Sequence, residues 1–198
     1  FAHCNCLERD MSTWEPLPPV RRVVTAINDR RRSFIAEDGP SPASMTVPER
    51  PGYRNSNLWR TEGGPTDLTQ SDTVLQQSGV LPPSGGTVLR VIDFPPQAAT
   101  LEEQQRQSAA VFAAIYPDAK HQPAHGRHAG MHITDTVDYA IVLQGEIVAI
   151  MEDDQTVLRA GDVLIQRGTN HAWANQSTQI ARVAFVLVDA TGSRPSAR

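Results

Sequence analysis

Short apolar runs recur through the second half of the chain. Each is cut off by a glycine or an acidic turn, and each is about as long as one strand. This pattern is typical of successive antiparallel strands. It therefore predicts an antiparallel β unit in this part of the chain. The runs are Tyr139–Leu143, Ile147–Met151, Val163–Ile165 and Ile180–Val188.

The first half of the chain carries further strand signals. The first two runs, Arg21–Ala26 and Ser33–Glu37, are separated by the turn residues Asn28 and Asp29, which predicts a hairpin at the start of the chain. Residues 61–86 are rich in Gly, Pro, Ser, Thr and Gln and show no sustained period, so we expect a long surface loop that is either functional or poorly ordered. The predicted strands are Arg21–Ala26, Ser33–Glu37, Tyr53–Arg60 and Thr87–Phe94.

One clear helix is predicted, over residues 101–115. Thr100 and Glu103 are the two ends of a capping box, in which the side chains satisfy free backbone N–H groups at a helix start. A second loop, residues 116–126, then leads toward the candidate site. The positions that recur at helical spacing are Leu101, Gln105, Ala109, Phe112 and Ile115.

Composition and charge narrow the range of partners. The chain has 198 residues, 39% of them hydrophobic, which is enough for one domain with a buried core. The formal net charge of −4 and the pI near 5.8 argue against a nucleic-acid partner. The basic run Arg30–Arg32 is expected to be a solvated hairpin end. No apolar run reaches the roughly 18 residues of a membrane span and no signal-peptide pattern is visible, so we expect a soluble cytoplasmic protein.

The chain is expected to form one domain with extensions. Residues 1–10 look foreign to the rest of the chain, and Met11 would be a natural start, so we interpret them as an upstream remnant. Residues 11–100 would supply N-terminal strands and the long loop. Residues 101–190 would supply the helix and the main β unit, and residues 191–198 a loose tail.

The two cysteines, Cys4 and Cys6, offer no disulfide framework, which agrees with a reducing compartment. Together with His3 they could suggest a metal site. However, no second ligand pair lies at zinc spacing, so we expect no zinc site there.

The stretch 126–175 carries the candidate chemistry and resembles the cupin family. The first cupin motif runs Gly, five residues, His-x-His, three or four residues, Glu, six residues, Gly. In this sequence Thr134 stands at the second His and Asp138 at the Glu. The matching positions are Gly126, His132, Asp138 and Gly145.

The second cupin motif runs Gly, five residues, Pro-x-Gly, two residues, His, three residues, Asn. It fits if one residue is deleted ahead of Gln166, which replaces the Pro. The strings Met-His-x-Thr-x-Thr-x-Asp-Tyr and Gln-Arg-Gly-Thr-x-His-x-Trp are similar to those of a group of small single-domain cupins, some of them beside natural-product pathways and labelled oxidoreductases. The motif glycines are interpreted as turn residues. The matching positions are Gly161, Gly168, His171 and Asn175.

The resemblance implies an all-β fold, a cupin jelly-roll antiparallel β-barrel with an N-terminal strand extension and one surface helix. It also implies a metal site of His132, Asp138 and His171. Along one strand His132 and Asp138 would lie roughly 20 Å apart, so they can share an ion only if the chain reverses. Asp135 and Thr136 are turn-compatible residues at that point. Two imidazoles and one carboxylate suit non-haem Fe(II), the favoured ion, although Zn, Mn or Ni would also fit.

Each candidate ligand has an alternative interpretation. His132 and His171 could be pocket histidines that are hydrogen-bonded to the backbone. Asp138 could orient an imidazole without touching the ion. Thr134 is a poor ligand for a divalent ion, so we expect it to line the pocket.

Four residues are predicted to line a substrate pocket. Arg167 would pair with a substrate carboxylate or enolate, or would be solvated in its turn. Trp173 follows His171 by two residues and would wall the pocket. The predicted lining residues are Thr134, His128, Arg167 and Trp173. The residues expected elsewhere are Tyr139, in the core, and His121 and His125, on the surface.

We interpret the sequence as a metal-dependent oxidoreductase that acts on a small oxygenated or aromatic molecule. Two alternatives stay open: a non-redox isomerase, dehydratase or decarboxylase, and a binding protein with a degenerate metal site. The hairpin at residues 21–37 has long edges that need covering, so we expect a homodimer in which it joins the partner's sheet.

Overall fold

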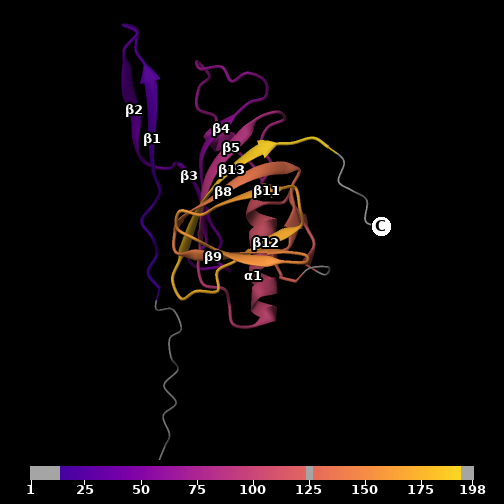
Figure 1. Ribbon diagram of the computed structural model, residues 1–198. Coiled ribbons are helices and arrows are strands. Elements are labelled where there is room, and N and C mark those ends of the chain that lie inside the picture. Colours follow the sequence, from indigo (N-terminus) through magenta and orange to yellow (C-terminus); the bar gives the residue numbers. More distant parts are fainter. Residues whose placement is uncertain (1–13, 124–126, 193–198) are drawn as a thin grey trace, which may run out of the picture.

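Two antiparallel sheets form the body of the molecule, with a two-stranded hairpin beside them (Figure 1). The structure is a computed structural model that describes residues 14–123 and 127–192. The larger sheet has six strands in the order β11-β8-β13-β5-β4-β3, and the smaller has five in the order β10-β9-β12-β7-β6. All of these pairings are antiparallel, so the predicted all-β class is confirmed.

Each run predicted from the sequence overlaps a strand, and further strands lie between these runs. The hairpin consists of β1, Arg21–Ile27, and β2, Ser33–Pro40. The larger sheet contains β3, Ala43–Thr46, β4, Arg54–Thr61, β5, Thr87–Phe94, β8, Thr136–Gln144, β11, Val163–Arg167, and β13, Ala181–Asp189. The smaller sheet contains β6, Lys120–His121, β7, His132–Ile133, β9, Glu146–Met151, β10, Gln155–Arg159, and β12, His171–Ala174.

The inner face of the larger sheet forms much of the core. Successive side chains of a strand point to opposite faces, so every second residue of the central strands faces the smaller sheet. The same alternation places Arg90 of β5 and Asp138 of β8 among apolar neighbours. The buried apolar residues of these strands include Val88, Ile92, Phe94, Ala140, Val142, Phe185 and Leu187.

The predicted helix is confirmed as α1, Leu101–Ile115. The Thr100 side chain accepts a hydrogen bond from the Glu103 backbone N–H at 3.3 Å, which satisfies one of the free donors at the helix start. Val111 and Ile115 are buried in the main core, so the helix packs against the sheets through this stripe.

Several local expectations are settled by the strand alternation and the turns. Tyr139 was predicted to pack in the core, which is wrong: it is 44% exposed, because it alternates with the inward-facing Asp138 on β8.

Residues 61–86 form the expected loop, with one 3₁₀ turn at Val74–Gln76. Strands β3, β6 and β10 were not predicted, and β6 lies within residues 116–126, which were expected to form a loop. The turn role of the motif glycines is confirmed by positive φ angles at Gly145, Gly161 and Gly168.

The hairpin β1–β2 extends away from the two sheets (Figure 1). Its turn carries Arg30–Arg32, all exposed as expected. Between residues 14 and 192, outside the gap at 124–126, no helix is long and apolar enough to cross a membrane. The interpretation of residues 1–10 and of the tail from residue 193 falls outside the described residues.

Candidate active site

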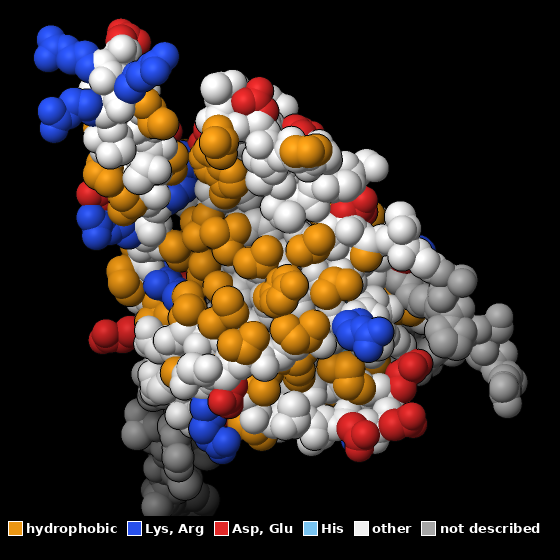
Figure 2. Space-filling view, turned by 45° about the horizontal axis from the view of Figure 1, so that its top comes forward, with side chains coloured by type: hydrophobic (Ala, Val, Ile, Leu, Met, Phe, Trp, Pro, Cys, Tyr) orange, Lys and Arg blue, Asp and Glu red, His pale blue; other side chains and the backbone are white. Residues whose placement is uncertain are grey.

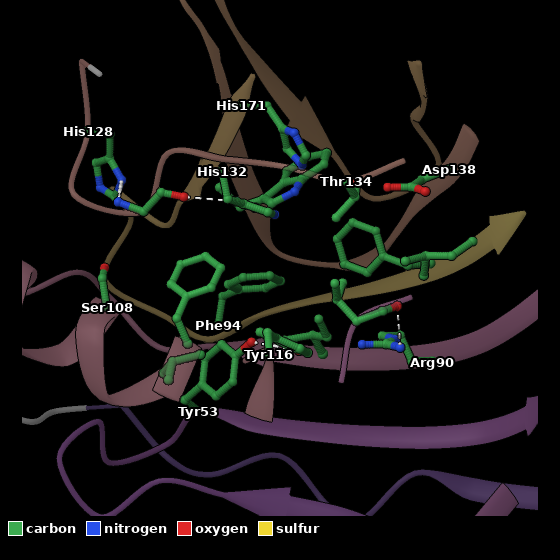
Figure 3. A pocket seen from close by; sticks show the side chains of 18 of the residues that line it. Tyr53, Arg90, Phe94, Ser108, Tyr116, His128, His132, Thr134, Asp138 and His171 are labelled. Atoms are coloured by element: carbon green, nitrogen blue, oxygen red, sulfur yellow. Dashed lines mark hydrogen bonds between the residues drawn. The ribbon is translucent and has the colours of Figure 1, made fainter. Parts of the chain in front are cut away.

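A cavity of about 80 Å³ lies between the two sheets and is partly covered by α1 (Figure 3). Both sheets contribute to it, and so do Ser108, Val111 and Phe112 of the helix. Aromatic rings make up much of its wall, which suits a planar organic ligand. The aromatic lining residues are Tyr53, Phe94, Phe112, Tyr116, Trp173 and Phe185.

Two histidines converge at one side of this cavity. Strands β7 and β12 pair so that His132 lies directly opposite His171. Their ring centroids are 4.3 Å apart with an interplanar angle of 46°. The predicted convergence of the two motif histidines is therefore confirmed, although Gly126 at the start of the first motif lies outside the described residues.

Both imidazoles are held in the same way. The Nδ1 atom of His132 lies 2.9 Å from the Gly130 carbonyl oxygen, and that of His171 lies 2.9 Å from the Thr169 carbonyl oxygen. A carbonyl oxygen only accepts, so Nδ1 carries the proton and Nε2 keeps its lone pair. Histidines that bind metals are commonly oriented by such a bond.

The electrostatics of the site also favour neutral imidazoles. Burial lowers the pKa of His132 to about 4, because the charged form loses its hydration. Burial, together with the neighbouring His132, lowers the pKa of His171 well below its ordinary value. At neutral pH both rings are therefore uncharged and able to act as ligands. Two imidazoles with Nε2 lone pairs fit a divalent ion.

Asp138 enters the cavity from the opposite sheet. It is 5% exposed, and its Oδ1 atom has no hydrogen-bond partner in the described part of the chain. Burial raises the pKa of Asp138 to about 6, because the charged form loses its hydration. A side-chain hydrogen bond with Thr136 and the charge of Arg90 each lower this pKa, but by less. In Figure 3, Thr134 lies between this carboxyl group and the imidazoles.

The carboxylate and the two imidazoles do not form a closed ligand set. Across residues 14–123 and 127–192, no three His, Cys, Asp or Glu side chains are grouped so that they could hold one ion. The predicted chain reversal does occur between β7 and β8, but it places Asp138 in the larger sheet and the histidines in the smaller one. Asp138 as a direct ligand therefore stays a prediction.

Three of the four predicted pocket residues line the cavity. Thr134 is 3% exposed, and Trp173 contacts the His171 ring edge-on, with centroids 5.8 Å apart. His128 accepts a hydrogen bond from the Gly130 N–H at its Nδ1 atom, 3.0 Å away. The proton of its neutral ring is then on Nε2, which is buried without a partner among the described residues.

Arg167 is the exception among the predicted pocket residues. On β11 the neighbouring Gln166 faces inward, where its amide donates to the Thr169 carbonyl at 3.1 Å, so Arg167 points out and is exposed. It lines a shallow hollow on the outside of the molecule instead. The expectation for His121 was also wrong, because its ring stacks on Phe112 with centroids 4.0 Å apart. His125 lies outside the described residues.

The sequence interpretation missed two arginines of the cavity, Arg50 and Arg90. Arg90 is only 1% exposed. A signal for it was present, since Arg90 interrupts the apolar positions of the alternating run Thr87–Phe94. Arg50 lies in a loop, and no local pattern indicates that it reaches the cavity.

Comparison with known proteins identifies the family. A family profile described as Cupin domain matches residues 120–188, the part of the chain that holds both histidines. This chain is a member of the cupin superfamily. The two facing sheets with one helix are accordingly a cupin β-barrel, as the resemblance implied.

Three relatives with similar sequences are fungal proteins. Phomopsin biosynthesis cluster protein C' of Diaporthe leptostromiformis is 32% identical over 140 residues, which are 67% of this chain and 59% of the relative. Oryzines biosynthesis cluster protein J of Aspergillus oryzae is 44% identical over 30% of this chain and 34% of its own length. A cupin-domain-containing oxidoreductase of Neurospora crassa is 24% identical over 88% of this chain and 79% of the relative. The chain thus spans less than two thirds of the length of the first two relatives.

Solved cupin structures are more distant. The Schizosaccharomyces pombe Cnp3 cupin domain aligns with 85% of this chain and 87% of its own length, at 13% identity and a TM-score of 0.41. A Cupin 2 conserved barrel domain protein of Salinispora arenicola aligns with 73% of this chain and 82% of its own length, at 12% identity and a TM-score of 0.38. At these scores the fold assignment rests on the family profile and on the strand order.

Proposed function

We propose that this cupin is a metal-dependent oxidoreductase acting on a small oxygenated or aromatic molecule. The observation that carries the proposal is the pair of neutral imidazoles, His132 and His171, whose Nδ1 atoms donate to backbone carbonyls and whose rings line an aromatic-walled cavity. The name of the Neurospora crassa relative supports the oxidoreductase class. Metal dependence and substrate class are inferred from the donor set and the wall of the cavity.

In this proposal His132 and His171 hold the ion, with Fe(II) favoured and Zn, Mn or Ni as alternatives. When bound, such an ion would supply Lewis-acid or redox chemistry at its open positions. Asp138 would either complete the ligand set or act on the substrate beside it. Thr134 takes the place of the second motif histidine, so one coordination position would be left to water or substrate.

The remaining cavity residues would bind and orient the substrate. Aromatic rings on both sheets would hold a planar molecule and exclude water from the reacting atoms. The buried Nε2–H of His128 is a donor without a partner among the described residues, so a substrate oxygen could accept from it. Trp173 packs against His171 and would fix that ring against rotation.

A non-redox enzyme is the second candidate, and Asp138 favours it. A buried carboxyl group with a pKa near 6 exchanges protons readily around neutral pH, which suits an acid or base in isomerisation, dehydration or decarboxylation. A binding protein with a degenerate site is the third candidate. It is favoured by the absence of a three-residue ligand set from the described ranges.

Elemental analysis of the purified protein tests the proposal. Iron or manganese at about one ion per chain is expected, and substitution of His171 with Ala should remove most of it. Arg159→Met is a control, since Arg159 is an exposed residue of β10 outside the cavity lining. Zinc would favour the non-redox enzyme. No stoichiometric metal would contradict the proposal and favour the binding protein.

We also propose that the protein is a homodimer in which the hairpin β1–β2 joins the partner's sheet. The hairpin carries large exposed apolar residues, and Figure 2 shows a broad apolar patch on the face beside it. Apolar surfaces of this kind commonly mark interaction sites. Sedimentation should show a dimer at micromolar concentration, and a monomer would contradict the proposal. The exposed hairpin residues are Val23, Ile27, Phe34 and Ile35.

A further inference from the structure

One buried charge in the cavity forms no ion pair. Arg90 lies on the inner face of β5, across the cavity from the two imidazoles (Figure 3). Its guanidinium group lies over the Tyr116 ring, with Cζ 5.5 Å from the ring centroid. No carboxylate lies within ion-pair distance of it in residues 14–123 or 127–192.

Two backbone carbonyls fix the position of the Arg90 guanidinium. Its Nη2 atom donates to the Gly79 carbonyl at 3.3 Å and to the Val80 carbonyl at 3.0 Å. These carbonyls are themselves held, since the Asp118 carboxylate accepts from the Val80 N–H at 2.7 Å. The Nε and Nη1 atoms are buried and have no hydrogen-bond partner among the described residues. Hydrogen-bond donors are therefore left over at the cavity wall.

Arg22, a second buried arginine among the described residues, shows what a paired guanidinium looks like in this fold. Arg22 is 6% exposed and contacts the carboxylates of both Glu37 and Asp72. Buried charges are ordinarily paired in this way, because an unpaired one is costly. Arg90 departs from this rule at a cavity, where a ligand can supply the missing partner.

No carboxylate of the cavity forms an ion pair with Arg90, although its charge acts on Asp138 from a distance. Asp138 is separated from Arg90 by strand β13, and its own Oδ1 atom is unpartnered in the described part of the chain. A second guanidinium, that of Arg50, lies 4.8 Å from the Tyr53 ring centroid. The hydroxyl groups of Tyr53 and Tyr116 are 3.0 Å apart, so the two cations flank a pair of tyrosines. The cavity thus has more positive than negative groups.

We propose that Arg90 binds an oxyanion of the ligand, a carboxylate or a phenolate, on a planar ring held between the aromatic walls. This deepens the proposed function and rests on it for the idea that the ligand is a substrate. A ligand bound in this way would place its ring between Arg90 and the imidazole pair. The two free donors of Arg90 are Nε and Nη1, so the oxyanion would accept charge-assisted hydrogen bonds from either or both.

Calorimetric titration with benzoate and with its neutral counterpart benzamide tests the proposal. The unmodified protein should bind benzoate roughly 10- to 100-fold more tightly, as expected for hydrogen bonds to a buried charged group. In Arg90→Met this preference should be lost, while benzamide binding changes little. A parallel pair, 4-nitrophenolate and nitrobenzene, distinguishes a phenolate site from a carboxylate site.

Two further variants keep the test decisive. Arg90→Lys keeps the charge with a different reach and should retain part of the preference. Arg159→Met removes an exposed arginine of β10, far from the cavity lining, and should leave the preference unchanged. Circular dichroism confirms that each variant is folded. If Arg90→Met does not fold, Arg90→Lys carries the test, and a preference in Arg90→Lys equal to that of the unmodified protein would overturn the proposal.

Repeating the titrations after chelator treatment separates this proposal from the proposed function. An Arg90-dependent preference for the anion in a protein that never holds metal would support the anion site and contradict the oxidoreductase. The anion site is overturned if neither anion is preferred, if the preference survives in Arg90→Met, or if it disappears on chelation, which would assign the anion to the ion instead.

Discussion

Strand β5 carries two buried charged residues, Arg90 and Asp93, that face opposite sides of the larger sheet. Asp93 is 2% exposed and accepts from Arg182 at 2.6 Å and from Arg54 at 2.6 Å. The same arginines also donate to the Leu17 and Pro18 carbonyls. Asp93 therefore ties the N-terminal segment to the sheet. Arg90 has no comparable partner.

The difference between the two faces separates a charge that is paired within the fold from one that our proposal assigns to a ligand. Around Asp93 the chain itself supplies every partner, and the donors come from strands β4 and β13 on either side. Around Arg90 and Asp138 the chain leaves donors and acceptors without partners among the described residues. Buried polar groups are nearly always satisfied in folded proteins, so unsatisfied ones at a cavity are candidates for contact with a ligand or an ordered water. Substitutions on the two faces should therefore behave differently.

The largest effect on stability is expected on the face of the larger sheet that carries Asp93, here called the outer face. Asp93→Ala leaves Arg54 and Arg182 largely buried without their carboxylate, and removing one partner of a buried ion pair typically costs about 3–5 kcal/mol. Both arginines keep some solvent contact, so the lower end of that range applies. Urea denaturation measures the free energy of unfolding. A loss below about 1 kcal/mol would show that the cluster is dispensable and would remove one side of the comparison.

An increase in the free energy of unfolding, of intermediate size, is expected for Asp138→Asn. The folded-state pKa of Asp138 is raised to about 6 from an ordinary value of 3.8, so the protonated carboxyl stabilises the fold at low pH and this contribution is lost as pH rises through about 6. Asn stays neutral. In chelated protein at pH 8 the variant should be more stable than the parent by about 2–3 kcal/mol at most.

The pH series supplies the control for Asp138→Asn. The advantage should shrink as pH falls below about 6, where the parent carboxyl is protonated. His132 acts in the other direction, since its lowered pKa means that its contribution is lost as pH falls toward about 4, but parent and variant share that change. An advantage that is independent of pH would contradict the assigned titration. If added metal reverses the order at pH 8, Asp138 is a ligand.

The contrast between the two faces also shows what the sequence could and could not predict. Strand β5 and helix α1 were predicted with their observed bounds, because alternation and capping are local signals. The convergence of His132 and His171 was predicted from motif spacing. The positions of Arg50 and Arg167 were not predicted. That of Arg50 depends on the path of a loop, and that of Arg167 depends on which face of the edge strand β11 turns inward. Pairing across sheets, such as that of Asp93 with Arg182, has no local signal at all.

The smallest effect on stability is expected for Arg90→Met. The substitution removes two hydrogen bonds to carbonyls, worth about 1 kcal/mol each, but it also removes a buried charge that has no counter-ion among the described residues, and methionine fills a similar volume. These terms oppose one another, so the free energy of unfolding should change by less than about 1 kcal/mol. Arg182→Met is the matched comparison on the outer face and should cost about 2–3 kcal/mol, because it strips Asp93 of one partner. Equal losses in the two variants, measured by urea denaturation, would mean that Arg90 is held for the fold and not for a ligand.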